Sequence, residues 1–127
     1  WVTTYPFAKL KSDWPNAGMV DVDSSIPFRG HINIGNDVWI GKGVTIFGGA
    51  NIGDGAIIGA NTTVAGTVAP YAIVVGNPAE LTRYRFDADT IAKLLELKWW
   101  NWPVEKIQQY CHLLASNNFE ELFNIKD

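Results

Sequence analysis

The sequence lacks several features that would place it in common classes of protein. Its one cysteine, Cys111, cannot form an internal disulfide, which fits a reducing compartment, and we expect a cytoplasmic protein. The 10 Lys and Arg against 13 Asp and Glu give a net charge of −3 without a basic run, which argues against a nucleic-acid or anionic-membrane surface. No apolar stretch approaches the roughly 20 residues that span a bilayer. The first residue is Trp1 rather than Met, so we expect a processed, trimmed or partly covered chain.

An aliphatic residue recurs every six positions through the middle of the chain. The series is Ile34, Ile40, Ile46, Ile52, Ile58 and Val64, and a Gly or Ala follows all but Ile46. A period of six fits neither the 3.6-residue repeat of a helix nor the alternation of a strand. It fits a coil of triangular cross-section, in which each hexad forms one side and turns one corner.

The hexads therefore predict a mainly β fold, a parallel β-helix whose interior is a ladder of aliphatic side chains. Three hexads make one coil, so residues 34–69 predict two coils stacked at roughly 4.8 Å. The alternative, a Gly-rich β-sandwich, would show alternating strands of uneven length. In this interpretation the chain is one domain, with the β-helix and a loop-rich N-terminal region at 1–86.

Residues 87–127 change to helical patterns and predict a C-terminal cap of the same domain. Asp87 or Asp89 can cap a first helix, and Pro103 suits the first turn of a second. A short third helix is expected at 118–123. We expect these helices to close an open end of the prism, where unpaired strand edges would otherwise invite aggregation.

Several motifs resemble one family closely. They are Ile-Gly-Asn-Asp-Val-Trp-Ile-Gly at 34–41, Ile-Gly-Asp-Gly-Ala-Ile-Ile-Gly-Ala-Asn at 52–61 and Pro-Tyr-Ala-Ile-Val-Val-Gly-Asn-Pro-Ala at 70–79. Thr-Tyr-Pro-Phe at 4–7, Arg-Phe at 85–86 and Lys-Trp-Trp-Asn-Trp-Pro at 98–103 narrow the resemblance. Together they are similar to the xenobiotic branch of the hexapeptide-repeat acyltransferases, which includes virginiamycin (streptogramin) and chloramphenicol acetyltransferases. The resemblance implies a left-handed β-helix, although the general crossover rule favours the right hand.

The resemblance also implies an acetyl-CoA-dependent O-acetyltransferase that works as a homotrimer without a metal. In the family a histidine is the general base, and it lies a few residues before the Thr-Tyr-Pro-Phe motif, so the expected base falls upstream of Trp1. His31 is a poor substitute because it sits at the entry to the repeat. His112 is expected on a cap helix, and two histidines cannot supply the three imidazoles of the zinc site found in related carbonic anhydrases.

Candidate binding residues follow from the same resemblance. The expected acetyl-CoA contacts are Trp39, Gly59, Ala60, Ala65, Arg83 and Arg85. Many relatives carry a Thr-Lys pair near the CoA phosphates where this chain has Ala65 and Gly66, so Arg83 or Arg85 would compensate. Tyr5 and Trp14, the latter in a loop at 14–26, are expected on the acceptor side. Asp54 is expected to form a turn.

The expected function is therefore acetylation of a hydroxyl group on a small molecule, such as a streptogramin or chloramphenicol. Two alternatives stay open at this point. One is a sugar O-acetyltransferase of surface-polysaccharide biosynthesis. The other is a non-catalytic trimeric scaffold, because the expected histidine lies outside this sequence.

Overall fold

Short parallel strands stack into a three-sided coil, as the hexads predict. The structure is a computed structural model that describes residues 2, 4, 5, 10, 13–19 and 29–125. The first coil has β1 (Asn33–Ile34), β2 (Trp39–Ile40) and β3 (Thr45–Ile46), and the second has β4 (Asn51–Ile52), β5 (Ile57–Ile58) and β6 (Thr63–Val64). Each strand of the first coil pairs in parallel with the strand 18 residues later, as in Asn33↔Asn51, Trp39↔Ile57 and Thr45↔Thr63. Three hexads therefore make one coil.

The second residue of each strand forms the interior ladder. In the second coil Ile52, Ile58 and Val64 are at most 1% exposed. In the first coil Ile34 and Ile40 are 48% and 40% exposed, because β1 and β2 pair with a described neighbour on one side only. Apolar burial is thus concentrated in the second and third coils, where Val68, Ala72 and Val74 join the same buried cluster.

The last predicted hexad is two residues short. A hexad of full length would place the next ladder residue six positions after Val64, at Pro70. Instead β7 (Thr67–Val68) begins only three residues after Val64, and Ile52 pairs with Val68, 16 residues later. Gly66 lies at this tight corner with φ +96°, a backbone conformation that residues other than glycine rarely adopt.

The third coil ends in a reversal of the chain. β8 (Ala72–Val75) pairs in parallel with β5, and β9 (Glu80–Tyr84) then folds back antiparallel on β8. The Gly76 N–H donates to the buried Thr62 hydroxyl at 3.2 Å, and its carbonyl accepts from the Thr63 N–H at 2.9 Å. These bonds fix the turn, so the four-stranded sheet β2-β5-β8-β9 ends in an antiparallel strand.

The C-terminal region forms the three expected helices. They are α3 (Ala88–Leu97), α4 (Val104–Leu114) and α5 (Phe119–Phe123), with a 3-10 turn η2 (Trp99–Asn101) between the first two. Asp87, rather than Asp89, caps α3, because its carboxylate accepts from the Thr90 N–H at 2.9 Å. None of the helices in the described part of the chain is long and apolar enough to cross a membrane.

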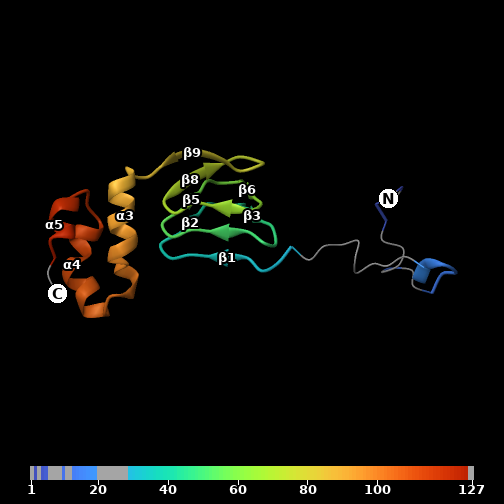
Figure 1. The fold of residues 1–127 in the computed structure, drawn as a ribbon, viewed down its shortest axis with the longest axis horizontal. Helices are drawn as coiled ribbons and strands as arrows, with labels where there is room; N and C mark the ends of the chain where they lie inside the picture. The colour runs from blue at the N-terminus through green and yellow to red at the C-terminus, as the bar shows by residue number, and fades with distance from the viewer. Residues whose placement is uncertain (1, 3, 6–9, 11–12, 20–28, 126–127) are drawn as a thin grey trace.

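The helices do not close an end of the prism. Figure 1 shows β1 at one end of the stack and β9 at the other, with α3 running alongside the stack. Leu94, Leu113 and Leu122 pack with Tyr71, which projects from a corner of the third coil. The expectation of an end cap is therefore corrected: the tyrosine gives the helices an apolar surface at the side of the coil.

Candidate functional site

One outward face of the coil carries two of the predicted cofactor residues. Trp39 on β2 lies in register with Ile57 on β5, then Ile73 on β8, then Arg83 on β9. Trp39 is 57% exposed, because it alternates with the ladder residue Ile40 and points away from the core. We call the column formed by Trp39, Ile57, Ile73 and Arg83 the β2 face. It offers a flat aromatic surface at one end and a cation at the other.

Gly59 and Ala60 lie at the corner that follows β5, beside the β2 face. A Cβ built on Gly59 would stand 2.7 Å from Val75 Cγ1 in the next coil. One built on Gly41, in the coil before, would stand 2.6 Å from the Ala60 backbone nitrogen. Small residues are therefore required here by coil stacking itself, and they also leave the backbone open to close approach by a ligand.

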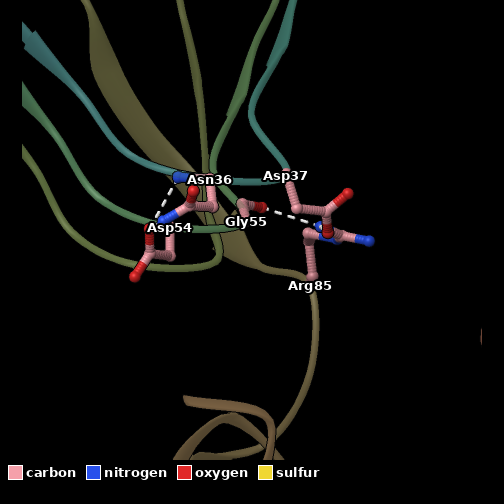
Figure 2. Close-up of polar contacts among 5 residues, drawn as sticks. All are labelled: Asn36, Asp37, Asp54, Gly55 and Arg85. Carbon is pink, nitrogen blue, oxygen red and sulfur yellow. Dashed lines mark hydrogen bonds and ion pairs between the residues drawn. The ribbon is translucent and has the colours of Figure 1, made fainter. Parts of the chain in front are cut away.

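The two arginines occupy different surroundings. Arg83 is exposed on β9, and its Nη1 donates to the carbonyl of Tyr84 at 3.2 Å. Arg85 lies past the end of β9, beside the corner that holds Asp37, Gly55 and Tyr71 in successive coils. Its Nη1 donates to the Gly55 carbonyl at 2.8 Å and pairs with the Asp37 carboxylate at 3.3 Å (Figure 2).

Arg85 also lies against two aromatic rings. Its guanidinium carbon is 5.3 Å from the centre of the Tyr71 ring and 5.2 Å from that of Phe86. Because these contacts join three coils to the start of the helical region, the structure gives Arg85 a bridging position. Arg83 is the arginine that shares a face with Trp39.

Asp54 behaves as the expected turn residue. Its Oδ1 accepts from the backbone N–H of Asn36 at 2.6 Å and from the Asn36 side-chain amide at 3.0 Å. Figure 2 shows this pair on the other side of the corner from Arg85. The carboxylate thus holds the first coil to the second.

The remaining predicted residues lie apart from the β2 face or stay untested. Ala65 is exposed at the shortened corner between β6 and β7, away from the β2 face. Tyr5 and Trp14 are 39% and 50% exposed, and the backbone carbonyl of Trp14 accepts from the Ala17 N–H at the 3-10 turn η1 (Ala17–Met19). Residues 20–26 of the predicted acceptor loop lie outside the described residues, and an acceptor-side role for Tyr5 and Trp14 stays a prediction.

Neither histidine shares the β2 face. His31 is exposed just before β1, where the carbonyl of its neighbour Gly30 accepts from the Gly49 N–H. His112 is exposed on α4. Among the described residues, no three side chains of His, Cys, Asp or Glu come together as a group that could hold a metal ion.

Sequence reasoning did not single out Tyr71. This side chain is 1% exposed, and its hydroxyl has no hydrogen-bond partner among the described residues. Burial, and then the charge of Asp37, raise the pKa of the Tyr71 phenol to about 12. The available signal was positional, because Tyr71 takes the corner position filled by Asp37 and Gly55 in the coils before it.

Comparison with known proteins identifies relatives that share the hexad region. The family model for bacterial transferase hexapeptide (six repeats) matches residues 31–66. A probable macrolide acetyltransferase of Lysinibacillus sphaericus is 47% identical over 97% of this chain and 68% of its own length. A chloramphenicol acetyltransferase of Agrobacterium fabrum is 44% identical over 97% of this chain and 57% of its own length.

Solved structures align over a shorter region. A hexapeptide-repeat acetyltransferase of Vibrio cholerae is 40% identical over 46% of this chain and 33% of its own, with a TM-score of 0.45. The chain therefore spans between about half and two thirds of the curated relatives, and a smaller part of this solved structure.

Proposed function

The chain belongs to the hexapeptide-repeat acetyltransferases, and we propose that the protein transfers the acetyl group of acetyl-CoA to a hydroxyl group of a small molecule. The observation that carries the proposal is the 47% identity with a probable macrolide acetyltransferase across 97% of the chain. The acceptor we propose is an antibiotic, because relatives are named for macrolides, chloramphenicol and virginiamycin A.

The proposed reaction is attack of the acceptor hydroxyl on the thioester carbonyl. A general base takes the hydroxyl proton as the new C–O bond forms, and the tetrahedral intermediate expels the CoA thiolate, which takes up a proton. Backbone N–H groups can stabilise the oxyanion. We propose that the base is a histidine contributed from outside residues 1–127, since His31 and His112 both lie away from the β2 face.

Acetyl-CoA is proposed to lie along the β2 face and its neighbouring corner. The exposed indole of Trp39 would cover the apolar end of the pantetheine, and Gly59 and Ala60 would let the chain of the ligand approach the coil. Arg83 is the better placed phosphate donor, because Arg85 is already paired with Asp37 and Gly55. Ala65 lies off this path, at the corner between β6 and β7, and takes no part in the proposed site.

The assembly is proposed to be a homotrimer of left-handed β-helices, as the family resemblance implies. The exposed Trp39 on the β2 face supports an occupant there, since an uncovered tryptophan beside two half-buried isoleucines is unfavourable in water. In a trimer, a neighbouring subunit and acetyl-CoA would share that covering role.

The test is release of free CoA thiol from acetyl-CoA in the presence of macrolide, streptogramin, chloramphenicol and sugar acceptors. We expect thiol release with at least one antibiotic and a mass gain of one acetyl group on it. Activity on sugars alone would replace the antibiotic acceptor with a saccharide. Absence of transfer to every acceptor, with acetyl-CoA still bound, would favour a non-catalytic scaffold.

A further inference from the structure

The β2 face has a definite length between its aromatic end and its cationic end. Trp39 on β2 and Arg83 on β9 are separated by three steps between neighbouring strands, through Ile57 and Ile73. At about 4.8 Å a step, the column is roughly 14 Å long. Ile57 and Ile73 are half-buried, so the surface between the two ends is apolar.

The pantetheine arm of acetyl-CoA matches this length. It has about as many chain bonds as four residues, so it spans roughly 14 Å when extended. With the thioester beside Trp39, the phosphate group next to the arm would reach Arg83, and the adenosine with its 3′-phosphate would lie beyond β9. This placement rests on the proposed acetyl transfer and concerns which part of the donor the site recognises.

Arg83 is suited to bind one phosphate group. Its side chain is exposed at the end of the column. A guanidinium has several N–H groups in one plane and can bind a phosphate through two of them at once. The bond from Nη1 to the Tyr84 carbonyl, at 3.2 Å, leaves N–H groups of Arg83 for a ligand.

A carboxylate stands near Arg83 at the same end. Glu80 begins β9, is exposed and lies in register with Val75, whose side chain borders the corner at Gly59. Its negative charge disfavours a further phosphate group at this corner. The end of the column therefore favours a ligand with one phosphate there over a ligand with several.

The other cationic side chains in the described part of the chain lie away from this end. Arg85 is held by Asp37 and the Gly55 carbonyl. Lys42 follows β2, at the Trp39 end of the column. The remaining cations lie before β1, on the helices or directly after α3, and they are Arg29, Lys93, Lys98 and Lys106.

We propose that the site recognises its donor through the pantetheine arm and a single phosphate group, so that acetyl-4′-phosphopantetheine is a donor comparable with acetyl-CoA. The adenosine and its 3′-phosphate then contribute little to binding. The bonds that change are the same for both donors, because the C–S bond that breaks and the C–O bond that forms lie at the Trp39 end. The thiol released is then that of 4′-phosphopantetheine.

Calorimetric binding of CoA, 3′-dephospho-CoA, 4′-phosphopantetheine and pantetheine tests the proposal. We expect the first three to have Kd values within about threefold of one another, and pantetheine to bind roughly tenfold more weakly because it lacks one charge-assisted contact. A preference of about tenfold or more for CoA over 4′-phosphopantetheine would overturn the proposal, as would equal binding of 4′-phosphopantetheine and pantetheine. Absence of binding by all four would overturn it together with the proposed function.

Arg83→Gln assigns the phosphate contact. It should weaken the binding of 4′-phosphopantetheine to the level of pantetheine and leave the binding of pantetheine unchanged. Lys42→Gln removes an exposed cation at the Trp39 end and is the matched control, which should keep the parent's ratio between the two Kd values. The same ratio in the Arg83 variant as in the parent would overturn the assignment.

Steady-state transfer from acetyl-CoA and from acetyl-4′-phosphopantetheine separates this proposal from the proposed function. We expect similar kcat/KM for the two donors. Transfer from acetyl-CoA alone would overturn the present proposal and leave the proposed function standing. Transfer from neither donor, with the expected binding ratios, would overturn the proposed function while the recognition of the arm and its phosphate holds.

Discussion

One corner position shows how different side chains share a single backbone requirement. Asp37, Gly55 and Tyr71 follow one another at this position in successive coils, at φ +52°, +69° and +56°. The position requires left-handed backbone, which costs non-glycine residues about 1–2 kcal/mol. Asp37 uses the position for an ion pair, and Tyr71 uses it to reach the helices. Gly55 between them provides the space that the tyrosine ring fills.

Gly55→Ala tests that division directly. A Cβ at residue 55 would overlap the Tyr71 ring and would also be strained by the positive φ, so we expect a loss of about 3 kcal/mol of unfolding free energy. Urea denaturation measures it. Gly66→Ala is the control, because its φ is +96° but a Cβ there would meet nothing within 4 Å. The Gly66→Ala variant should lose only about 1 kcal/mol of unfolding free energy. Equal losses at both sites would rule out the steric role of the Tyr71 ring.

Trp39→Ala tests the proposed role of the β2 face in binding acetyl-CoA. We expect the KM for acetyl-CoA to rise roughly tenfold, equivalent to about 1.4 kcal/mol, with little change in kcat. Phe47→Ala removes an aromatic side chain of similar exposure beside β3, off the β2 face, and should leave KM unchanged. Unaltered kinetics in the Trp39 variant would restrict this residue to packing.

At the scale of the element, the ladder residues recur regularly in the sequence but contribute unequally to stability. Ile40 and Ile58 are register partners on β2 and β5, yet one is 40% exposed and the other fully buried. Ile58→Ala should cost about 3–4 kcal/mol, because it leaves a cavity in the centre of the coil. Ile40→Ala should cost about half as much or less. Chemical denaturation of both variants gives the comparison, and similar losses would mean that the first coil is covered in solution.

The start of α3 has a pH dependence of its own. Hydrogen bonds from the backbone N–H and then the hydroxyl of Thr90 lower the pKa of the Asp87 carboxyl. A lowered pKa gives stability that is present above the ordinary value of 3.8 and is lost as pH falls below it. Asp87→Ala should lower Tm at pH 7 and flatten this acid loss, whereas Asp89→Ala should lower Tm less, since Asp89 only faces the positive end of the helix dipole and the hydrogen bonds from Thr90 go to Asp87. Thermal melts between pH 2 and 7 distinguish the two.

The elements that follow the hexad period could be predicted from sequence, and those that depend on a single local choice could not. The ladder at Ile34, Ile40, Ile46, Ile52, Ile58 and Val64 was correct because each repeat meets the same steric demand. The corner at Gly66 breaks the period by two residues, and glycine alone does not reveal where a repeat is shortened. The reversal into β9 depends on bonds between Thr62 or Thr63 and Gly76, which are distant in sequence.

At the scale of the whole molecule, the helices and the coil are held together at one corner. Sequence patterns predicted three helices but placed them at an end of the prism, because an amphipathic pattern shows which face is apolar and not what it will cover. The surface that receives them is made by Tyr71 and Phe86, with Arg85 over both rings. The two arginines, Arg83 and Arg85, thus have different surroundings although only one residue separates them in sequence.

Substituting the two arginines separates those roles. Arg85→Ala removes the bonds to Gly55 and Asp37 and should cost about 1–2 kcal/mol of stability, since the pair is partly exposed. Arg83→Ala should leave stability unchanged and raise the KM for acetyl-CoA. Denaturation and steady-state kinetics on both variants decide the assignment. A reversed pattern would transfer the proposed phosphate contact from Arg83 to Arg85.

In the first two coils, residues 18 apart in the sequence lie on the same side of the prism. Inserting one full coil at a corner would lengthen the stack by about 4.8 Å and leave every downstream residue on its own side of the prism. Inserting a single hexad would instead rotate all downstream side chains by one side, carrying a residue such as Arg83 off the face of Trp39. The corner at Gly66 is two residues shorter than the others, yet Val68 still pairs with Ile52 on the same side of the prism. A change of length within a corner therefore alters the residue count of a coil without moving the downstream strands to another side.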